Sequence, residues 1–163
     1  MPKYLMLLLS FLATDGYAIG WKPPERLLNA VRRVESSDGL FTYGDEGRSL
    51  GDFQLSEAAW MDVTSWRRSH GVKAYGYSSH VYDRRVNRSY AADYITLLHD
   101  ELERVYKRPP TSGEIYAAYN MGLGSFASCR YKLQRVNAVT ARKCQAVHAY
   151  MQGAPELRLT SIQ

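Results

Sequence analysis

Cysteine and histidine are scarce in this chain of 163 residues, which has two cysteines and four histidines. The histidines, at positions 70, 80, 99 and 148, are dispersed and show no His-x-x-x-His spacing, so the sequence predicts no metal site. Long runs are missing as well. The apolar run at residues 4–13 is too short to cross a bilayer as a helix, and no run of five or more basic residues occurs. These shortages argue against a zinc module, a stable membrane insertion and a basic nucleic-acid-binding tail.

The two cysteines, Cys129 and Cys144, lie fifteen residues apart near the C-terminus. In an oxidising compartment an even pair at this spacing predicts a disulfide that ties two adjacent elements together. Two free buried thiols are the alternative.

The chain is moderately basic, with a formal net charge of +5 at pH 7. Such a charge suits a polyanionic partner, either a polymer of the bacterial envelope or nucleic acid. The basic residues come as scattered pairs such as Arg32-Arg33 and Arg142-Lys143. Scattered pairs are more typical of a solvated surface, so we expect no nucleic-acid partner.

The N-terminus has the pattern of a secretory signal peptide. Lys3 precedes the apolar run, and the small residues Gly16 and Ala18 follow it. We therefore expect a cleaved signal at residues 1–20 and a soluble protein that is secreted or periplasmic. A buried N-terminal helix is the alternative.

The rest of the chain is expected to form one mostly helical domain, residues 21–153, before a polar tail at residues 154–163. A helix begins near Pro23-Pro24-Glu25 and runs to Glu35. Residues 39–51 carry four glycines and predict a loop or a small β-hairpin, so the fold class is mostly α with a small β region. Asp52 or Ser56 then begins a second helix.

Three further helices are expected in the second half. Residues 71–86 show no clear period and predict a loop, after which Asn87 can cap a long helix that Pro109-Pro110 stops. The capping-box pattern from Thr111 to Glu114 opens the next helix, which ends near residues 120–122. A last helix is expected at about residues 136–152.

Glu35 is the central candidate for chemistry. Leu27, Leu28, Val31 and Val34 recur at helical spacing, so the last apolar turn places Glu35 at the helix end, between an apolar floor and a polar loop. Partial burial disfavours the ionised form of a carboxyl group, which a general acid near neutral pH requires. A solvated glutamate before small polar C-cap residues is the simpler interpretation of this motif alone.

Three segments together resemble the signature of the lysozyme-like clan that contains goose-type lysozymes and soluble lytic transglycosylases. The first is the helix that ends in Glu35-Ser36-Ser37. The second is Gly51-Asp52-Phe53-Gln54, in the place of the family's Gly-x-x-Gln motif. The third is Ala118-Tyr119-Asn120-Met121-Gly122, close to Ala-Tyr-Asn-x-Gly. They occur in the family's order over residues 34–124.

The resemblance implies a role for each matching residue. Glu35 matches the catalytic acid/base and Ser36 a position that helps to bind sugar or water. Gln54 matches a residue that holds substrate in the groove, and Tyr119 and Asn120 match the floor beneath the acid, where we expect the Tyr119 phenol to hydrogen-bond Glu35. The implied substrate is peptidoglycan, cleaved between N-acetylmuramic acid and N-acetylglucosamine without a metal or organic cofactor.

The chain departs from the family pattern in its acidic residues. Gly-Asp-Phe-Gln places Asp52 near the groove, and Asp45 and Glu46 lie in the loop before it. A hydrolase uses a second carboxylate as nucleophile or base, so Asp45, Glu46 or Asp52 would allow a muramidase. A lytic transglycosylase needs only Glu35, because the N-acetyl group of the substrate can assist. The latter is our first expectation.

A third possibility is a non-catalytic module that binds glycan strands on the same scaffold. The presence of Glu35 argues against it, since a module without activity needs no carboxyl group there. In each case we expect a monomer whose partner is the glycan strand.

Overall fold

The computed structural model describes residues 20–153 apart from the side chain of Asp45. The predicted signal peptide, apart from Gly20, and the predicted tail at residues 154–163 lie outside the described residues. Within residues 20–153 the chain is mostly helical with one small antiparallel sheet, as the sequence predicts. No helix in this range is long and apolar enough to cross a membrane.

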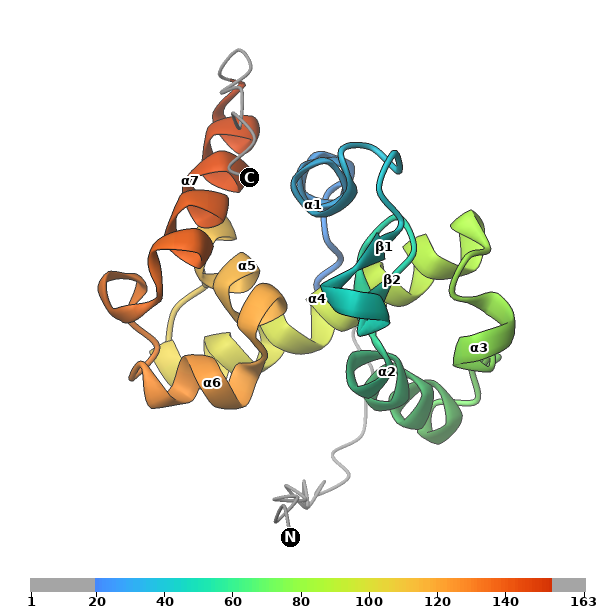
Figure 1. The fold of residues 1–163 in the computed structure, drawn as a ribbon. Helices are drawn as coiled ribbons and strands as arrows, with labels where there is room; N and C mark the ends of the chain where they lie inside the picture. Colours follow the sequence, from blue (N-terminus) through green and yellow to red (C-terminus); the bar gives the residue numbers. More distant parts are fainter. Residues whose placement is uncertain (1–19, 154–163) are drawn as a thin grey trace, which may run out of the picture.

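The first half of the chain supplies α1 (Glu25–Ser36), β1 (Tyr43–Gly44), a 3₁₀ turn (Asp45–Gly47), β2 (Ser49–Leu50), β3 (Leu55–Ser56), α2 (Glu57–Ser69) and α3 (Tyr77–His80). The second half supplies α4 (Arg84–Tyr106), α5 (Ser112–Met121), α6 (Leu123–Ser128), a 3₁₀ turn (Leu133–Arg135) and α7 (Ala138–Gln152). In Figure 1 the long helix α4 runs behind both groups, with α1, the sheet, α2 and α3 on one side and α5, α6 and α7 on the other. Two lobes therefore share one backing helix.

Local sequence signals explain most helix starts. The Ser56 side chain accepts a hydrogen bond from the backbone of α2, and Thr111 and Glu114 form the predicted capping box of α5. The predicted cap of α4 is wrong, because Asp83 occupies that position. Asn87 lies inside α4, fully buried, and its Oδ1 accepts a hydrogen bond from the Phe53 amide at 2.9 Å. This bond ties α4 to the turn that precedes β3.

The sheet is a three-stranded meander in the order β1-β2-β3, with Leu50 opposite both Tyr43 and Leu55. Gly51 begins the turn between β2 and β3 with φ +78, and a Cβ there would lie 2.4 Å from the carbonyl oxygen of Val81. Only glycine fits this position, because any side chain would collide with the backbone beside α3. The turn brings Gln54 back over the sheet.

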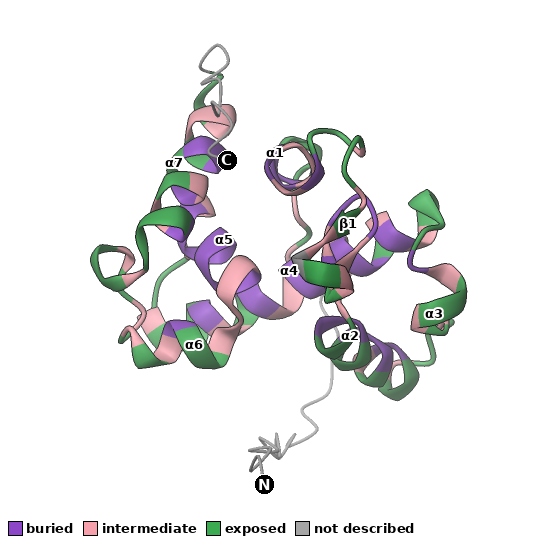
Figure 2. Cartoon of the chain, in the orientation of Figure 1, coloured by how far each residue is buried: buried purple, intermediate pink, exposed green. Residues whose placement is uncertain are grey.

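The core is one cluster of buried side chains around α4 and α5. Trp60 of α2 stacks on Tyr90 of α4 with ring centroids 3.7 Å apart, and both rings are fully buried. Helix α5 is buried without interruption from Gly113 to Tyr119, and Figure 2 shows further buried stretches on α1, α2 and α4, which surround the core. The helix that carries the third motif is therefore held on all sides.

The predicted disulfide is wrong, because Cys129 and Cys144 are both free. Cys144 is buried on α7 against Gly113 of α5, and burial raises the pKa of its thiol to about 11. Cys129 is only half-buried, and its thiol donates a hydrogen bond to the carbonyl oxygen of Arg135 at 3.4 Å. The two thiols are thus directed at different elements, which sequence spacing alone does not reveal.

Candidate active site

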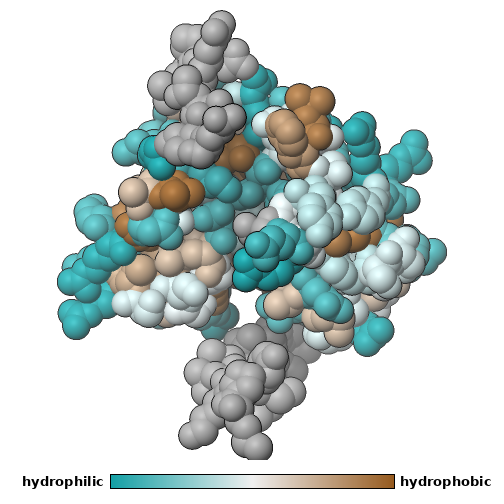
Figure 3. Space-filling model, viewed as in Figure 1, coloured by the Kyte–Doolittle hydropathy of each residue, from teal (hydrophilic) through white to brown (hydrophobic). Residues whose placement is uncertain are grey.

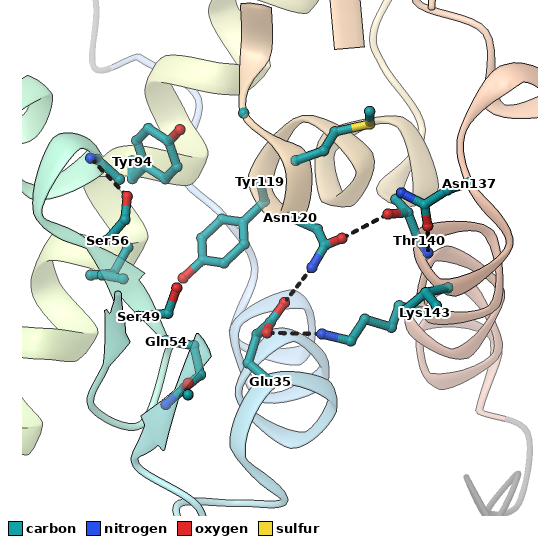
Figure 4. A pocket seen from close by; sticks show the side chains of 16 residues that line it. Glu35, Ser49, Gln54, Ser56, Tyr94, Tyr119, Asn120, Asn137, Thr140 and Lys143 are labelled. Atoms are coloured by element: carbon teal, nitrogen blue, oxygen red, sulfur yellow. Dashed lines mark hydrogen bonds and ion pairs between the residues drawn. The ribbon is translucent and has the colours of Figure 1, made fainter. Parts of the chain in front are cut away.

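A cleft of about 760 Å³ opens where the two lobes meet. Its walls come from the end of α1, the small sheet, the start of α2, the middle of α4, the end of α5 and the first half of α7. Figure 3 shows hydrophilic residues, in teal, over the middle of this face, and Figure 4 looks into the cleft. The volume is in the range that proteins use to enclose small ligands or parts of larger ones.

Glu35 reaches the cleft from the last turn of α1. Val31 and Val34 bury the inner face of this helix, and Ser37 ends it in the left-handed conformation. The Glu35 side chain is only 7% exposed. The sequence therefore predicted correctly that a largely buried carboxyl group lies at the end of this helix.

Three side chains from the second half of the chain contact the Glu35 carboxyl group. The Tyr116 hydroxyl donates to Oε1, and the Asn120 amide approaches the same oxygen at 3.5 Å. The Lys143 ammonium donates to Oε2 at 3.2 Å. A buried carboxylate needs such partners, because charge without compensation is costly away from water.

Tyr116 is the hydroxyl donor, although the motif predicted Tyr119. The Tyr119 hydroxyl donates instead to the carbonyl oxygen of Phe53 at 2.6 Å. The two residues are one turn apart on α5, with near-parallel rings whose centroids are 6.3 Å apart, and of the two phenols it is Tyr116 that hydrogen-bonds Glu35. Burial first, and then the charge of Glu35, raises the pKa of Tyr116 well above its usual value. Tyr116 therefore stays a neutral donor at all physiological pH values.

Asn120 lies beside Glu35, as the motif predicts. Its Oδ1 accepts a hydrogen bond from the Thr140 hydroxyl at 2.9 Å, while its amide faces Glu35. An ionised carboxylate only accepts, so the amide nitrogen of Asn120 faces Glu35 and its Oδ1 is left to accept from the Thr140 hydroxyl. A polar chain from α7 through α5 to α1 results.

Gln54 lines the cleft opposite α7, also as predicted. Its backbone is left-handed with φ +47. Its amide nitrogen donates to the carbonyl oxygens of Gly51 at 2.8 Å and Phe41 at 3.2 Å. Both amide hydrogens are thereby engaged, and Oε1, which lies over Gly44, is the atom suited to accept a hydrogen bond from a ligand.

Ser36 does not face the cleft, so its predicted role in substrate binding is wrong. The side chain is buried, and its hydroxyl donates to the carbonyl oxygen of Asp52 at 2.6 Å while accepting from the Gly39 amide at 2.8 Å. Ser36 lies one position beyond Glu35, and a turn of about 100° per residue points it away from the cleft. It pins the end of α1 to the turn that carries Gln54.

The three candidate second carboxylates differ in their surroundings. Asp52 is buried but outside the cleft lining, and Arg32 pairs with it at 2.9 Å and Arg84 at 3.6 Å. Glu46 is exposed and does not line the cleft. The side chain of Asp45 lies outside the described part of the structure. The structure therefore does not place Asp52 or Glu46 where a second catalytic carboxylate would act, and Glu35 is the one carboxyl group among the described lining residues.

Four lining residues at the start of α7 were missed by the motifs: the N-cap residue Asn137, and Val139, Thr140 and Lys143 of the helix itself. Lys143 belongs to the Arg142-Lys143 pair, which the sequence analysis assigned to a solvated surface. A signal was present, because positions 140, 143 and 147 recur at helical spacing and Thr140 and Val147 are buried. Lys143 thus shares a face with core residues, unlike the exposed Arg142.

The described residues contain no group of three or more histidine, cysteine, aspartate or glutamate side chains placed to hold a metal ion. Comparisons of the chain with protein-family models, curated proteins and solved structures gave no match. The assignment of a function therefore depends on the residues and geometry of the cleft.

Proposed function

We propose that this protein is a lytic transglycosylase that cleaves the β-1,4 bond between N-acetylmuramic acid and N-acetylglucosamine in peptidoglycan. The proposal rests chiefly on Glu35, a single buried carboxyl group in a cleft, held by a neutral phenol, an amide and an ammonium group. The three segments that resemble the lysozyme-like clan support it, since they supply Glu35, Gln54 and Asn120 to one cleft. Export by the predicted signal would bring the enzyme to its polymer.

The first step transfers a proton from Glu35 to the glycosidic oxygen as the bond between this oxygen and the anomeric carbon (C1) of the muramoyl residue breaks. The carbonyl oxygen of the substrate's own N-acetyl group attacks that carbon, which takes the place of a protein nucleophile. Glu35, now ionised, then removes the proton from the C6 hydroxyl of the same sugar. The C6 oxygen bonds to C1, the bond between C1 and the N-acetyl carbonyl oxygen breaks, and the product is an anhydro sugar that keeps its N-acetyl group. Glu35 ends protonated, as it began.

The contacts of Glu35 support a different role for each of its oxygens in this proposal. Oε1 accepts from Tyr116 and Asn120, so it is held in place, and the proton is exchanged through Oε2. Oε2 is the oxygen that Lys143 contacts in the ionised form. Gln54, across the cleft, would accept a hydrogen bond from a sugar hydroxyl or N-acetyl N–H group through Oε1.

A single carboxyl group favours the transglycosylase over a muramidase. A retaining or inverting hydrolase places two carboxyl groups about 5–10 Å apart across the bond that it cleaves. Of the described candidates, Asp52 is paired with Arg32 outside the cleft and Glu46 is exposed outside it. A reaction that uses the substrate's own N-acetyl group needs no such partner.

The test compares the wild type with Glu35→Gln on purified peptidoglycan. Glutamine keeps the shape of the side chain and cannot give up a proton, so we expect the release of soluble fragments to fall by about 10²- to 10⁴-fold. Mass spectrometry of the fragments should show anhydro-muramoyl ends. Reducing ends in their place would make the protein a muramidase, and equal release by both proteins would remove Glu35 from the mechanism. Release by neither would leave a non-catalytic glycan-binding module.

A further inference from the structure

Lys143 carries the one positive charge among the described residues that line the cleft, and Glu35 carries the one negative charge. Its side chain is 28% exposed, and its ammonium lies 3.2 Å from Glu35 Oε2. Figure 4 shows it extending from α7 across the cleft toward α1. Any ligand that approaches Glu35 Oε2 must therefore pass close to the Lys143 ammonium.

The charge balance of the cleft changes when Glu35 takes up its proton. In the ionised form, the carboxylate and the ammonium neutralise each other. In the protonated form, which the first chemical step requires, the Lys143 charge has no counter-charge among the lining residues. A partly buried cation in that situation favours a ligand that brings an anion with it.

The ammonium also has the capacity to bind such an anion. An ammonium group has three N–H donors, and Glu35 accepts one of them. The flexible four-carbon stem can turn the others toward the cleft. On the same wall, Asn137 adds an amide whose oxygen accepts from the Thr140 backbone and whose nitrogen can donate to a ligand, whereas the Thr140 hydroxyl already donates to Asn120. These groups suit a small, charged and hydrogen-bonding substituent.

We propose that Lys143 binds the free lactyl carboxylate of the muramoyl residue, so that the preferred substrate is a glycan strand from which the stem peptides have been removed. This inference rests on the proposed function above. The lactyl group is attached to the sugar whose glycosidic bond is cleaved. Lys143 lies next to Glu35 Oε2, the oxygen that would deliver the proton to the glycosidic oxygen. Carboxylates of the stem peptide are several bonds farther away. When a peptide is attached, the lactyl carboxyl group is a neutral amide and offers no charge.

A place in a reaction sequence follows from this preference. The substrate is supplied by an amide hydrolysis that cuts the bond between the lactyl group and the first residue of the stem peptide. The enzyme then acts after the peptides have been removed, on strands that are no longer cross-linked.

The test uses two glycan substrates that differ in a single charge. Peptide-free strands are prepared by amide hydrolysis, and half of the sample is coupled to methylamine, which converts the lactyl carboxylate to a neutral amide. We measure kcat/KM from the release of anhydro ends for both. A charge-assisted hydrogen bond predicts that the wild type prefers the charged strand by about tenfold or more.

The Lys143→Met variant should lose this preference, with a ratio between the two substrates close to one. Methionine keeps most of the length and apolar contact of the stem, and the melting temperature checks that the variant is folded. Lys143→Arg should keep most of the preference, because it keeps the charge. Arg142→Met removes a charge from the neighbouring exposed position and should leave the ratio unchanged.

The separate outcomes distinguish the two proposals. If Lys143→Met slows both substrates by the same factor, Lys143 only holds Glu35 and the inference is refuted while the proposed function stands. Equal rates of the wild type on both strands refute it as well. If the wild type cleaves neither strand nor intact peptidoglycan, the proposed function and this inference fail together.

Discussion

Replacing Tyr116 with phenylalanine removes one buried hydroxyl group and, with it, a hydrogen bond to the Glu35 carboxyl group. That hydroxyl donates to Glu35 Oε1, and the side chain is fully buried, so water does not replace it. A hydrogen bond to a charged group contributes about 1.5–3 kcal/mol, which corresponds to roughly a 10- to 150-fold change in rate. Since Tyr116 orients the acid and does not line the cleft, we expect the loss in kcat, with KM nearly unchanged.

Tyr119→Phe is the matched control on the same helix. It removes a hydroxyl that donates to the carbonyl oxygen of Phe53 and does not contact Glu35. A neutral hydrogen bond of about 0.5–1.5 kcal/mol should appear as a lower melting temperature, with kcat within a few-fold of the wild type. Steady-state release of anhydro ends and thermal denaturation measure both quantities. If Tyr119→Phe loses kcat while Tyr116→Phe keeps it, the assignment of the two tyrosines is wrong.

Two further predictions concern the substrate wall and the stability. Gly44→Ala places a Cβ 2.0 Å from Gln54 Oε1, so the amide must swing away from its hydrogen bonds with the Gly51 and Phe41 carbonyl oxygens. KM for glycan strands should rise severalfold and the melting temperature should fall slightly, whereas an unchanged KM would show that Gln54 does not bind substrate. Burial would raise the pKa of Glu114, but hydrogen bonds from Arg108 and Thr111 outweigh it and the pKa is lowered. A lowered pKa means that Glu114 stabilises the fold above its unfolded pKa and loses this effect as the pH falls through its folded pKa. The melting temperature of Glu114→Gln should therefore lie below that of the wild type at pH 7 and approach it at pH 3, whereas a constant difference would contradict the ion pair.

The sequence predicted the fold class and the place of Glu35 because both depend on local patterns. The apolar spacing of α1 determines which residue ends it, and the capping box determines where α5 begins. The residue that caps the N-terminus of α4 was harder to predict from the sequence. Asp83 and Asn87 are both good capping residues, and only the contact of Asn87 with Phe53 decides between them.

The side chains that contact the Glu35 carboxyl group could not be predicted from the sequence. Helix α5 is buried on all sides, so its pattern contains no polar face to show which tyrosine points at Glu35. Lys143 was missed because it is adjacent to another basic residue, Arg142, and the pair was treated as one solvated surface. Adjacent side chains on a helix point about 100° apart, so only Lys143 faces the cleft. The free cysteines likewise depend on the directions of two side chains and not on their spacing.

The sequence positions of the groups around Glu35 have a consequence for how the protein becomes active. The acid lies near the start of the folded chain, whereas Tyr116, Asn120 and Lys143 follow it by 81, 85 and 108 residues. A growing chain therefore contains Glu35 long before it contains the side chains that hydrogen-bond its carboxyl group. Under the proposed function, cleavage of glycan would begin only once α7 has docked, so the order of folding would itself delay activity until the whole domain is folded.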